Sequence, residues 1–205
     1  MNLCLLLLAF FLPPKAQAGE IIGGHESKPH SRPYMAYLQF VAQGVQKKCG
    51  GFLIREDFVL TALEKKANLN PAVQPIKLPR GKDKVKPGKV CIVAGWGRMA
   101  TNGKYPNTLQ EVKLKVQKHQ VCEREKLLKE FYKSSIQICV GDPKENKASF
   151  KVRLSFCPLV CNHVAQGIVS YGNKNGKPPR VYTKVSRFLQ WIKETMKSHQ
   201  LQETD

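Results

Sequence analysis

The sequence lacks an apolar run long enough to cross a membrane as a helix. Its longest such run, LCLLLLAFFL at Leu3–Leu12, has ten residues, about half of the roughly 20 that a spanning helix needs. The sequence also lacks any Asn-x-Ser/Thr acceptor, so we expect no N-glycosylation. It contains no Cys/His spacing typical of zinc sites and no glycine-rich phosphate loop. We therefore expect neither a metal nor a cofactor.

Acidic residues are scarce in this chain. There are 15 Asp and Glu against 34 Lys and Arg, which gives a formal net charge of +19. A surface of this charge attracts polyanions, among them DNA, RNA, anionic membranes and sulfated glycans, and composition alone does not separate them. The length of 205 residues allows one good core, as a single larger domain or as two small lobes.

The N-terminus has the pattern of a secretory signal. The apolar run is followed by Pro13-Pro14 and by the small-x-small triplet Ala16-Gln17-Ala18, which predicts a signal at residues 1–18 with cleavage after Ala18. A secreted protein meets sulfated glycans rather than nuclear DNA or RNA, so we expect no nucleic-acid partner. Six cysteines remain beyond the signal, and an oxidising compartment predicts disulfide bonds, although six cysteines allow 15 pairings.

The remaining chain reads mainly as strands separated by turns. Five runs are rich in β-branched and aromatic residues, at Arg32–Phe40, Cys49–Ala62, Val90–Gly97, Leu109–Gln117 and Pro158–Gly172. In the fourth run Val112, Leu114 and Val116 alternate with Lys113 and Lys115, which predicts a half-buried strand with a basic outer face.

Two stretches have helical patterns. Arg187–His199 is expected to dock on the β core through an apolar stripe that comprises Phe188, Trp191, Ile192, Thr195 and Met196. His119–Tyr132 is expected to form a short surface helix, with Val121, Leu128 and Phe131 on or near one side. These patterns predict an all-β protein with a C-terminal helix.

Four motifs stand out along the chain, namely GEIIGGHESKPHSRPYMAYLQF, KPGKVCIVAGWG, VAQGIVSYGNKNG and PPRVYTKVS. These motifs resemble those of the granzymes, the trypsin-fold serine proteases of cytotoxic lymphocyte granules, nearest their B and H members, and the resemblance covers most of the chain. It implies two six-stranded antiparallel β-barrels with an active site between them. We therefore expect an all-β, trypsin-like double barrel with a truncated N-terminal barrel and a C-terminal α-helix. The expected domain covers residues 21–205, with a first barrel at 21–78, a second barrel at 79–186 and a helix at 187–199.

The resemblance also implies how the chain would be processed and bridged. Residues 19–20 are similar to the activation dipeptide of granule proteases, and Ile21 would become the new N-terminus, whose ammonium normally pairs with a buried aspartate. Two pairs of cysteines match family disulfides, namely Cys91 with Cys161 and Cys122 with Cys139.

Four further residues match the substrate-binding part of the family. Ser170, Tyr171 and Gly172 match the strand that pairs with an extended peptide substrate. Arg180 matches the pocket arginine that selects an aspartate before the scissile bond, and a guanidinium suits a carboxylate because it stays charged and presents paired donors. By resemblance, these residues predict a pocket for acidic side chains.

The first departure from the family pattern follows the motif FVLTA. The family continues there with Ala-His-Cys, which carries the general base, and reaches the triad aspartate roughly fifty residues later. This sequence joins Thr61-Ala62 directly to Leu63-Glu64-Lys65-Lys66-Ala67. The resemblance therefore implies that the base, the aspartate and the disulfide partner of Cys49 are all absent. No remaining histidine falls at the position of the base.

The second departure replaces the family's Gly-Asp-Ser-Gly-Gly with six residues. Aligned from the Pro-Leu-Val-Cys side, Ser155 falls at the nucleophile position and Leu154 replaces the aspartate that would receive the Ile21 ammonium. Arg153 and Phe156 replace glycines needed in the oxyanion hole and the nucleophile turn. Cys157 has no family partner, so it is expected to be unpaired, as is Cys49.

Three functional interpretations follow from these residues. The first is a granzyme-family serine protease homologue that is catalytically inactive as written. The second is an active granzyme B-like endopeptidase that cleaves after acidic residues, in which case the gene model would omit a block. The third is a non-catalytic cationic granule protein that binds glycans or microbial surfaces. All three predict a secretory route and a granule or extracellular location, with sulfated proteoglycan or heparin-like glycan as a partner, and protein substrates if the chain is active.

Overall fold

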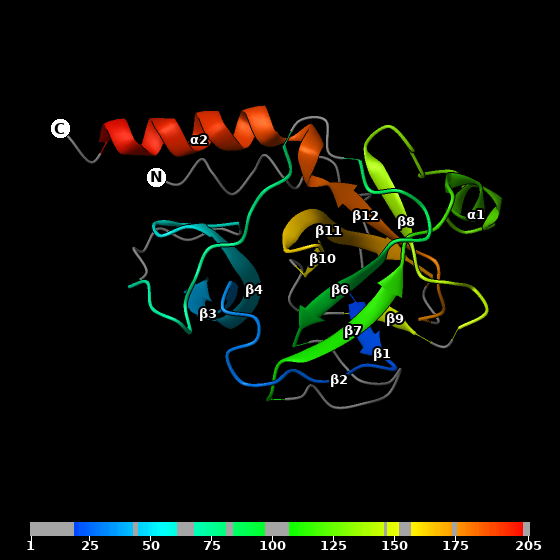
Figure 1. Cartoon of the computed structure of the whole chain (residues 1–205), viewed down its shortest axis with the longest axis horizontal. Coiled ribbons are helices and arrows are strands. Elements are labelled where there is room, and N and C mark those ends of the chain that lie inside the picture. Colours follow the sequence, from blue (N-terminus) through cyan, green and yellow to red (C-terminus); the bar gives the residue numbers. More distant parts are fainter. Residues whose placement is uncertain are drawn as a thin grey trace.

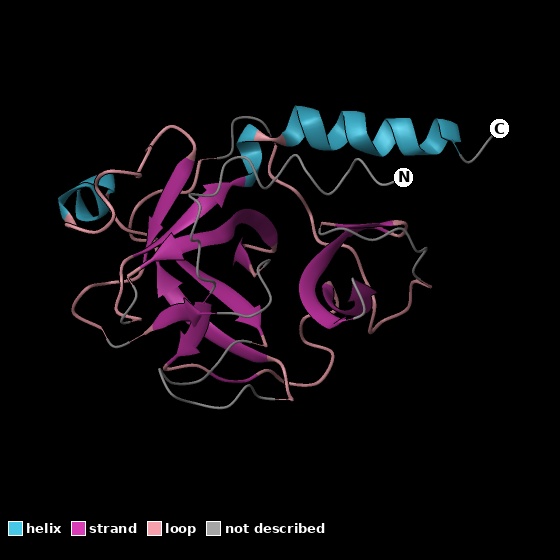
Figure 2. Cartoon of the chain, turned by 180° about the vertical axis from the view of Figure 1, so that it is seen from behind, coloured by secondary structure: helices cyan, strands magenta, loops and turns pink. Residues whose placement is uncertain are grey.

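The computed structural model describes residues 19–42, 45–60, 68–80, 84–96, 107–145, 147–151, 157–173 and 176–202. Strands are the commonest regular structure in the described chain, and helices lie at its periphery (Figure 1, Figure 2). The predicted signal at residues 1–18 lies outside these ranges. Within them, no helix has the length and apolar character needed to cross a membrane.

The larger sheet forms the second barrel. Its strand order is β2-β7-β6-β10-β11-β12-β8, and neighbouring strands are antiparallel. An additional bridge between Val116 and Val140 joins the end of β7 to β8. The six strands from β7 round to β8 therefore close into a barrel, as expected. The seven strands are β2 (His25–Glu26), β6 (Val90–Gly95), β7 (Gln110–Lys115), β8 (Gln137–Val140), β10 (Pro158–Cys161), β11 (Val164–Gly172) and β12 (Arg180–Lys184).

The barrel is filled by the apolar face of each strand. In β7, Val112 and Leu114 are buried whereas Lys113 and Lys115 are exposed, which confirms the predicted alternation. The barrel core also includes Val93, Val116, Ile138, Val140, Leu159 and Tyr182.

The first half of the chain contributes a smaller, three-stranded sheet in the order β3-β4-β5. This sheet has three described strands where the resemblance implies a barrel of six, in agreement with the expected truncation. A second core joins this sheet to the barrel and to the C-terminal helix through Tyr34, Phe52, Leu60, Ile76, Val160, Ala165, Val185 and Ile192. The strands are β3 (Met35–Ala42), β4 (Val45–Arg55) and β5 (Phe58–Val59).

The predicted C-terminal helix is present as α2 (Leu189–Gln202), after the 3-10 helix η2 (Val185–Arg187). Of its predicted stripe, Ile192 is buried, and Phe188, Trp191 and Met196 pack against the second core. Helix α2 runs along one side of the molecule, next to the three-stranded sheet in both views (Figure 1, Figure 2). The docking prediction is therefore confirmed.

The helix predicted for His119–Tyr132 is wrong in its length. Helix α1 covers only His119–Arg124, and its C-cap Glu125 has an extended backbone (φ −71°, ψ 117°). Turns follow, in which Leu128 is buried whereas Phe131 is 48% exposed. Buried Cys122 ties the short helix to β8, so this covalent anchor and the buried Leu128 fix the segment without a continuous helix.

The N-terminal residues form a two-stranded sheet of their own. Gly19 lies opposite Lys151 and Ile22 opposite Ala148 in an antiparallel pair. The activation dipeptide expected at residues 19–20 is therefore part of a regular strand in the uncut chain. The two strands are β1 (Gly19–Ile22) and β9 (Ala148–Lys151).

Candidate functional site

The predicted substrate-binding residues come together where β11 meets β12. Tyr171 lies opposite Val181 and Gly172 opposite Arg180 in the antiparallel register. The register shifts between Val169 and Tyr171, so the irregularity falls at Ser170. Residues about ten positions apart in sequence thus form one surface of the barrel.

Arg180 is packed tightly against the neighbouring strand. The residue is 2% exposed, and its NH1 donates a hydrogen bond of 3.1 Å to the carbonyl oxygen of Asn173. A Cβ atom placed on Gly172 would lie 2.5 Å from both Cδ and Nε of Arg180. Only glycine leaves room for this approach. The arrangement holds the guanidinium, a permanent positive charge, against β11.

The side chain of Tyr171 is held in place by a residue of β8. Its hydroxyl donates a hydrogen bond of 3.2 Å to Oε1 of Gln137, which also accepts one of 2.8 Å from the backbone N–H of Lys133. Burial raises the pKa of Tyr171 to about 12. The side chain is therefore a neutral, positioned hydroxyl near pH 7.

The structure contains both disulfide bonds that the resemblance implies. Cys91 and Cys161 join β6 to β10, with a Cα–Cα distance of 4.5 Å. The second bond, between Cys122 and Cys139, joins α1 to β8. Cys157 is 2% exposed and belongs to neither bond. The side chain of Cys49 lies outside the described residues.

The catalytic positions lie in the parts of the chain that are not described. These are Ser155, within residues 152–156, and the junction at residues 61–67. The described chain resumes at Cys157, whose carbonyl oxygen accepts a hydrogen bond of 3.1 Å from the N–H of Val169. The backbone of Ile21 lies in β1, opposite Ser149. The roles of Ser155 and Ile21 therefore stay predictions.

Two features of the described chain were not expected from the sequence. One is the contact of Asn173 with Arg180, for which no motif gives a signal. The other is a buried network around Glu111, which accepts hydrogen bonds from the Ser27 hydroxyl and, at 2.9 Å, from NH2 of Arg32. Although burial favours the neutral acid, the bonds from Ser27 and Arg32 and the charge of Arg32 lower the pKa of Glu111. The ionised carboxylate thus holds the N-terminal segment against β7.

Comparison with known proteins places this geometry in a family. The trypsin family profile matches residues 21–63 and 62–192. Human granzyme B is 49% identical over 250 aligned positions, which cover 97% of this chain and all of the relative. The chain is a granzyme-like member of the trypsin family. Human granzyme H is 46% identical, over 94% of this chain and 98% of its own.

Solved structures agree with this assignment. The structure described as "Structure of GrC" has a TM-score of 0.78 and 40% identity, and covers 86% of this chain and all of its own. Neuropsin, a serine protease expressed in the limbic system of mouse brain, has a TM-score of 0.70 and 28% identity over the same shares.

The alignment with granzyme B is longer than this granzyme-like chain. It runs over 250 positions, whereas the chain has 205 residues. At least 45 aligned positions of the relative therefore have no counterpart here. The two segments matched by the family profile also meet at residues 62 and 63.

Proposed function

We propose that this chain is a granzyme-family homologue without peptidase activity. The observation that supports the proposal is the division of the family match into two segments that meet at residues 62 and 63. At that point the sequence joins Thr61-Ala62 to Leu63, with no Ala-His-Cys between them. At least 45 positions of granzyme B have no counterpart in this chain. A missing block of that size at residues 62 and 63 agrees with the length of the family sequence that carries the base and the aspartate.

The chemistry of the remaining residues favours inactivity. A serine hydroxyl without an adjacent base is a poor nucleophile near neutral pH. Loss of the base alone costs a triad enzyme roughly 10⁶ in kcat. By resemblance, Arg153 and Phe156 stand at glycine positions around Ser155, and side chains at these positions are expected to hinder an oxyanion hole. Leu154 offers no charge to an Ile21 ammonium.

A fluorophosphonate probe tests this proposal, because only an assembled serine nucleophile reacts with it quickly. The full chain and the chain processed to begin at Ile21 are incubated with the probe, beside active human granzyme B as a positive control. Neither form of this chain is expected to be labelled above the background of its Ser155→Ala variant. Rapid labelling that the substitution abolishes would overturn the proposal.

The proposal extends to the substrate residues. Arg180 and the strand Ser170–Gly172 are proposed to bind peptides with acidic side chains, in the manner of the intact family, but without cleaving them. The hydrogen bond of Arg180 to Asn173 and its close packing on Gly172 support this role, since they fix the guanidinium in one position.

The proposed location is the secretory route and its granules, with sulfated glycan as the partner. The granzyme-like sequence and the net charge of +19 support this part of the proposal. Sulfate esters stay ionised at all physiological pH values, so a strongly basic protein is suited to them.

A further inference from the structure

A basic cavity lies on the second barrel, and neither Arg180 nor Ser170–Gly172 is among the residues that line it. It measures about 400 Å³, and eleven residues line it. Four of them are basic or imidazole side chains, and none is an acid. The lining residues are Lys84, Val85, Pro87, Val116, Gln117, His119, Ile138, Gln166, Lys184, Ser186 and Arg187.

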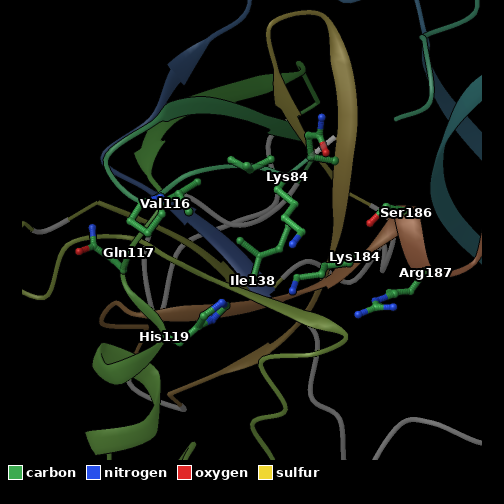
Figure 3. Close-up of a pocket in the computed structure, with 11 residues that line it drawn as sticks. Lys84, Val116, Gln117, His119, Ile138, Lys184, Ser186 and Arg187 are labelled. Atoms are coloured by element: carbon green, nitrogen blue, oxygen red, sulfur yellow. The ribbon is translucent and has the colours of Figure 1, made fainter. Parts of the chain in front are cut away.

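The cationic groups come from three separate segments of the chain and are directed at the same space. Figure 3 shows Lys84 and Lys184 pointing toward one another, with His119 on one side and Arg187 on the other. Lys84 precedes β6, His119 begins α1, Lys184 ends β12 and Arg187 ends η2. The closure of the barrel thus gathers positive charges that lie up to about a hundred residues apart in sequence.

Two of these cations are positioned by backbone carbonyls. Lys184 Nζ donates to the carbonyl oxygen of Ser134, and Arg187 Nε donates to that of Ser135 at 2.9 Å. No carboxylate within the described residues forms an ion pair with Lys84, Lys184 or Arg187. Their remaining N–H donors are therefore available to an anion held in fixed geometry.

The cationic groups of the cavity repel one another, and this repulsion appears in their pKa values. Burial and the charges of Arg187 and Lys84 lower the pKa of Lys184. Burial and the charge of Lys184 lower the pKa of His119, while Glu123 on α1 acts in the opposite direction. Mutual repulsion of this kind is relieved when an anion enters.

We propose that this cavity binds a sulfate group of a sulfated polysaccharide. The charged rim would hold the sulfate oxygens, and the apolar wall of Val85, Pro87 and Val116 would contact the face of the attached sugar ring. A single-stranded nucleic acid fits less well, because the cavity has no Trp, Tyr or Phe on which a base would stack. The inference rests on the proposed glycan binding and deepens it by naming the site.

The test compares two double variants of equal charge in the full chain. Lys184→Gln with Arg187→Gln removes two cavity cations, and Lys28→Gln with Lys113→Gln removes two exposed cations outside the cavity. Binding of a heparin hexasaccharide is measured by calorimetry at fixed, physiological salt. The cavity variant is expected to bind at least about tenfold more weakly, since charge-assisted hydrogen bonds are lost. The affinity of the control variant for the hexasaccharide is expected to fall by about twofold or less, because exposed charges outside the cavity act only through a field that salt screens.

A third variant guards against loss of folding. The side chain of Lys84 is exposed and forms no hydrogen bond with another described residue, so Lys84→Gln is expected to leave the fold intact. It is expected to weaken binding by about threefold or more. In an NMR titration of the wild-type chain, the hexasaccharide is expected to raise the pKa of His119, because a nearby anion favours the imidazolium.

Several outcomes would overturn the assignment. If the wild-type chain fails to bind the hexasaccharide at all, the proposed glycan partner is wrong. If it binds but the cavity and control variants weaken equally, the glycan partner stands and only this site is wrong. The third outcome is that inorganic sulfate or a single-stranded oligonucleotide raises the pKa of His119 at concentrations as low as those at which the hexasaccharide does. In that case the cavity is not specific for a polysaccharide.

Discussion

The buried carboxylate of Glu111 gives the sharpest prediction about stability. Glu111→Gln removes a negative charge that forms an ion pair with Arg32 at 2.9 Å. The Glu111 side chain is 11% exposed and the Arg32 side chain 19% exposed. The substitution also weakens the bond from the Ser27 hydroxyl. Charge-assisted bonds contribute about 1.5–3 kcal/mol each in buried settings, so the expected loss is about 2 kcal/mol. For a domain of this size, that loss corresponds to a fall in Tm of about 4–8 °C.

The pH dependence distinguishes a charge effect from a packing effect. Because the pKa of Glu111 is lowered on folding, its charge contributes stability above the unfolded pKa of about 4.3. That contribution is lost as pH falls through the lower folded pKa. The difference in Tm between wild type and Glu111→Gln is thus expected to be largest near neutral pH and to shrink below about pH 4.

Thermal unfolding followed by circular dichroism at several pH values checks both statements. Glu145→Gln serves as the matched control, because Glu145 lies 3.7 Å from Lys147 and both side chains are about half exposed. The control is expected to change stability by less than about 0.5 kcal/mol. An equal loss in both variants, or a difference for Glu111→Gln that persists undiminished at low pH, would refute the reasoning.

Two further predictions concern packing and covalent bonds. Gly172→Ala is expected to destabilise the chain by about 1–3 kcal/mol, because its Cβ would lie 2.5 Å from Arg180 atoms; denaturant titration would show this loss, and Ser170→Ala as a control in the same strand would not. Replacing both cysteines of the disulfide with a sequence separation of 70 is expected to cost about 4 kcal/mol, against about 3 kcal/mol for the one with a separation of 17. Guanidinium titration of the two double serine variants would rank them, and a larger loss for the shorter loop would contradict the loop-entropy argument.

Much of the fold follows from local patterns in the sequence. The alternation of Val112 and Leu114 with Lys113 and Lys115 predicts one buried face, and β7 has that face. The apolar stripe of α2 is likewise periodic and lies against the second core. At α1, a disulfide and a few buried side chains fix the chain, and the periodic pattern predicts a helix that is too long. The pattern does not reveal that Phe131 is exposed to solvent.

The site was predictable only as far as a motif marks it. The motif PPRVYTKVS indicates Arg180, but the packing of that side chain on Gly172 depends on the register of β11 and β12. The basic cavity has no motif, since Lys84, His119 and Lys184 come from distant segments that meet only when the barrel closes. Contacts of this kind depend on tertiary geometry, which a pattern in one segment does not contain.

The second core also determines how the chain comes apart. Phe52 from the three-stranded sheet, Val160 from the barrel and Ile192 from α2 belong to one buried cluster. Separation of any one of these three parts exposes apolar surface on the other two. We therefore expect the three-stranded sheet to unfold together with the other parts and not independently. Because α2 lies beside the three-stranded sheet (Figure 1), a cut in the C-terminal helix is expected to destabilise that sheet as well as the helix itself.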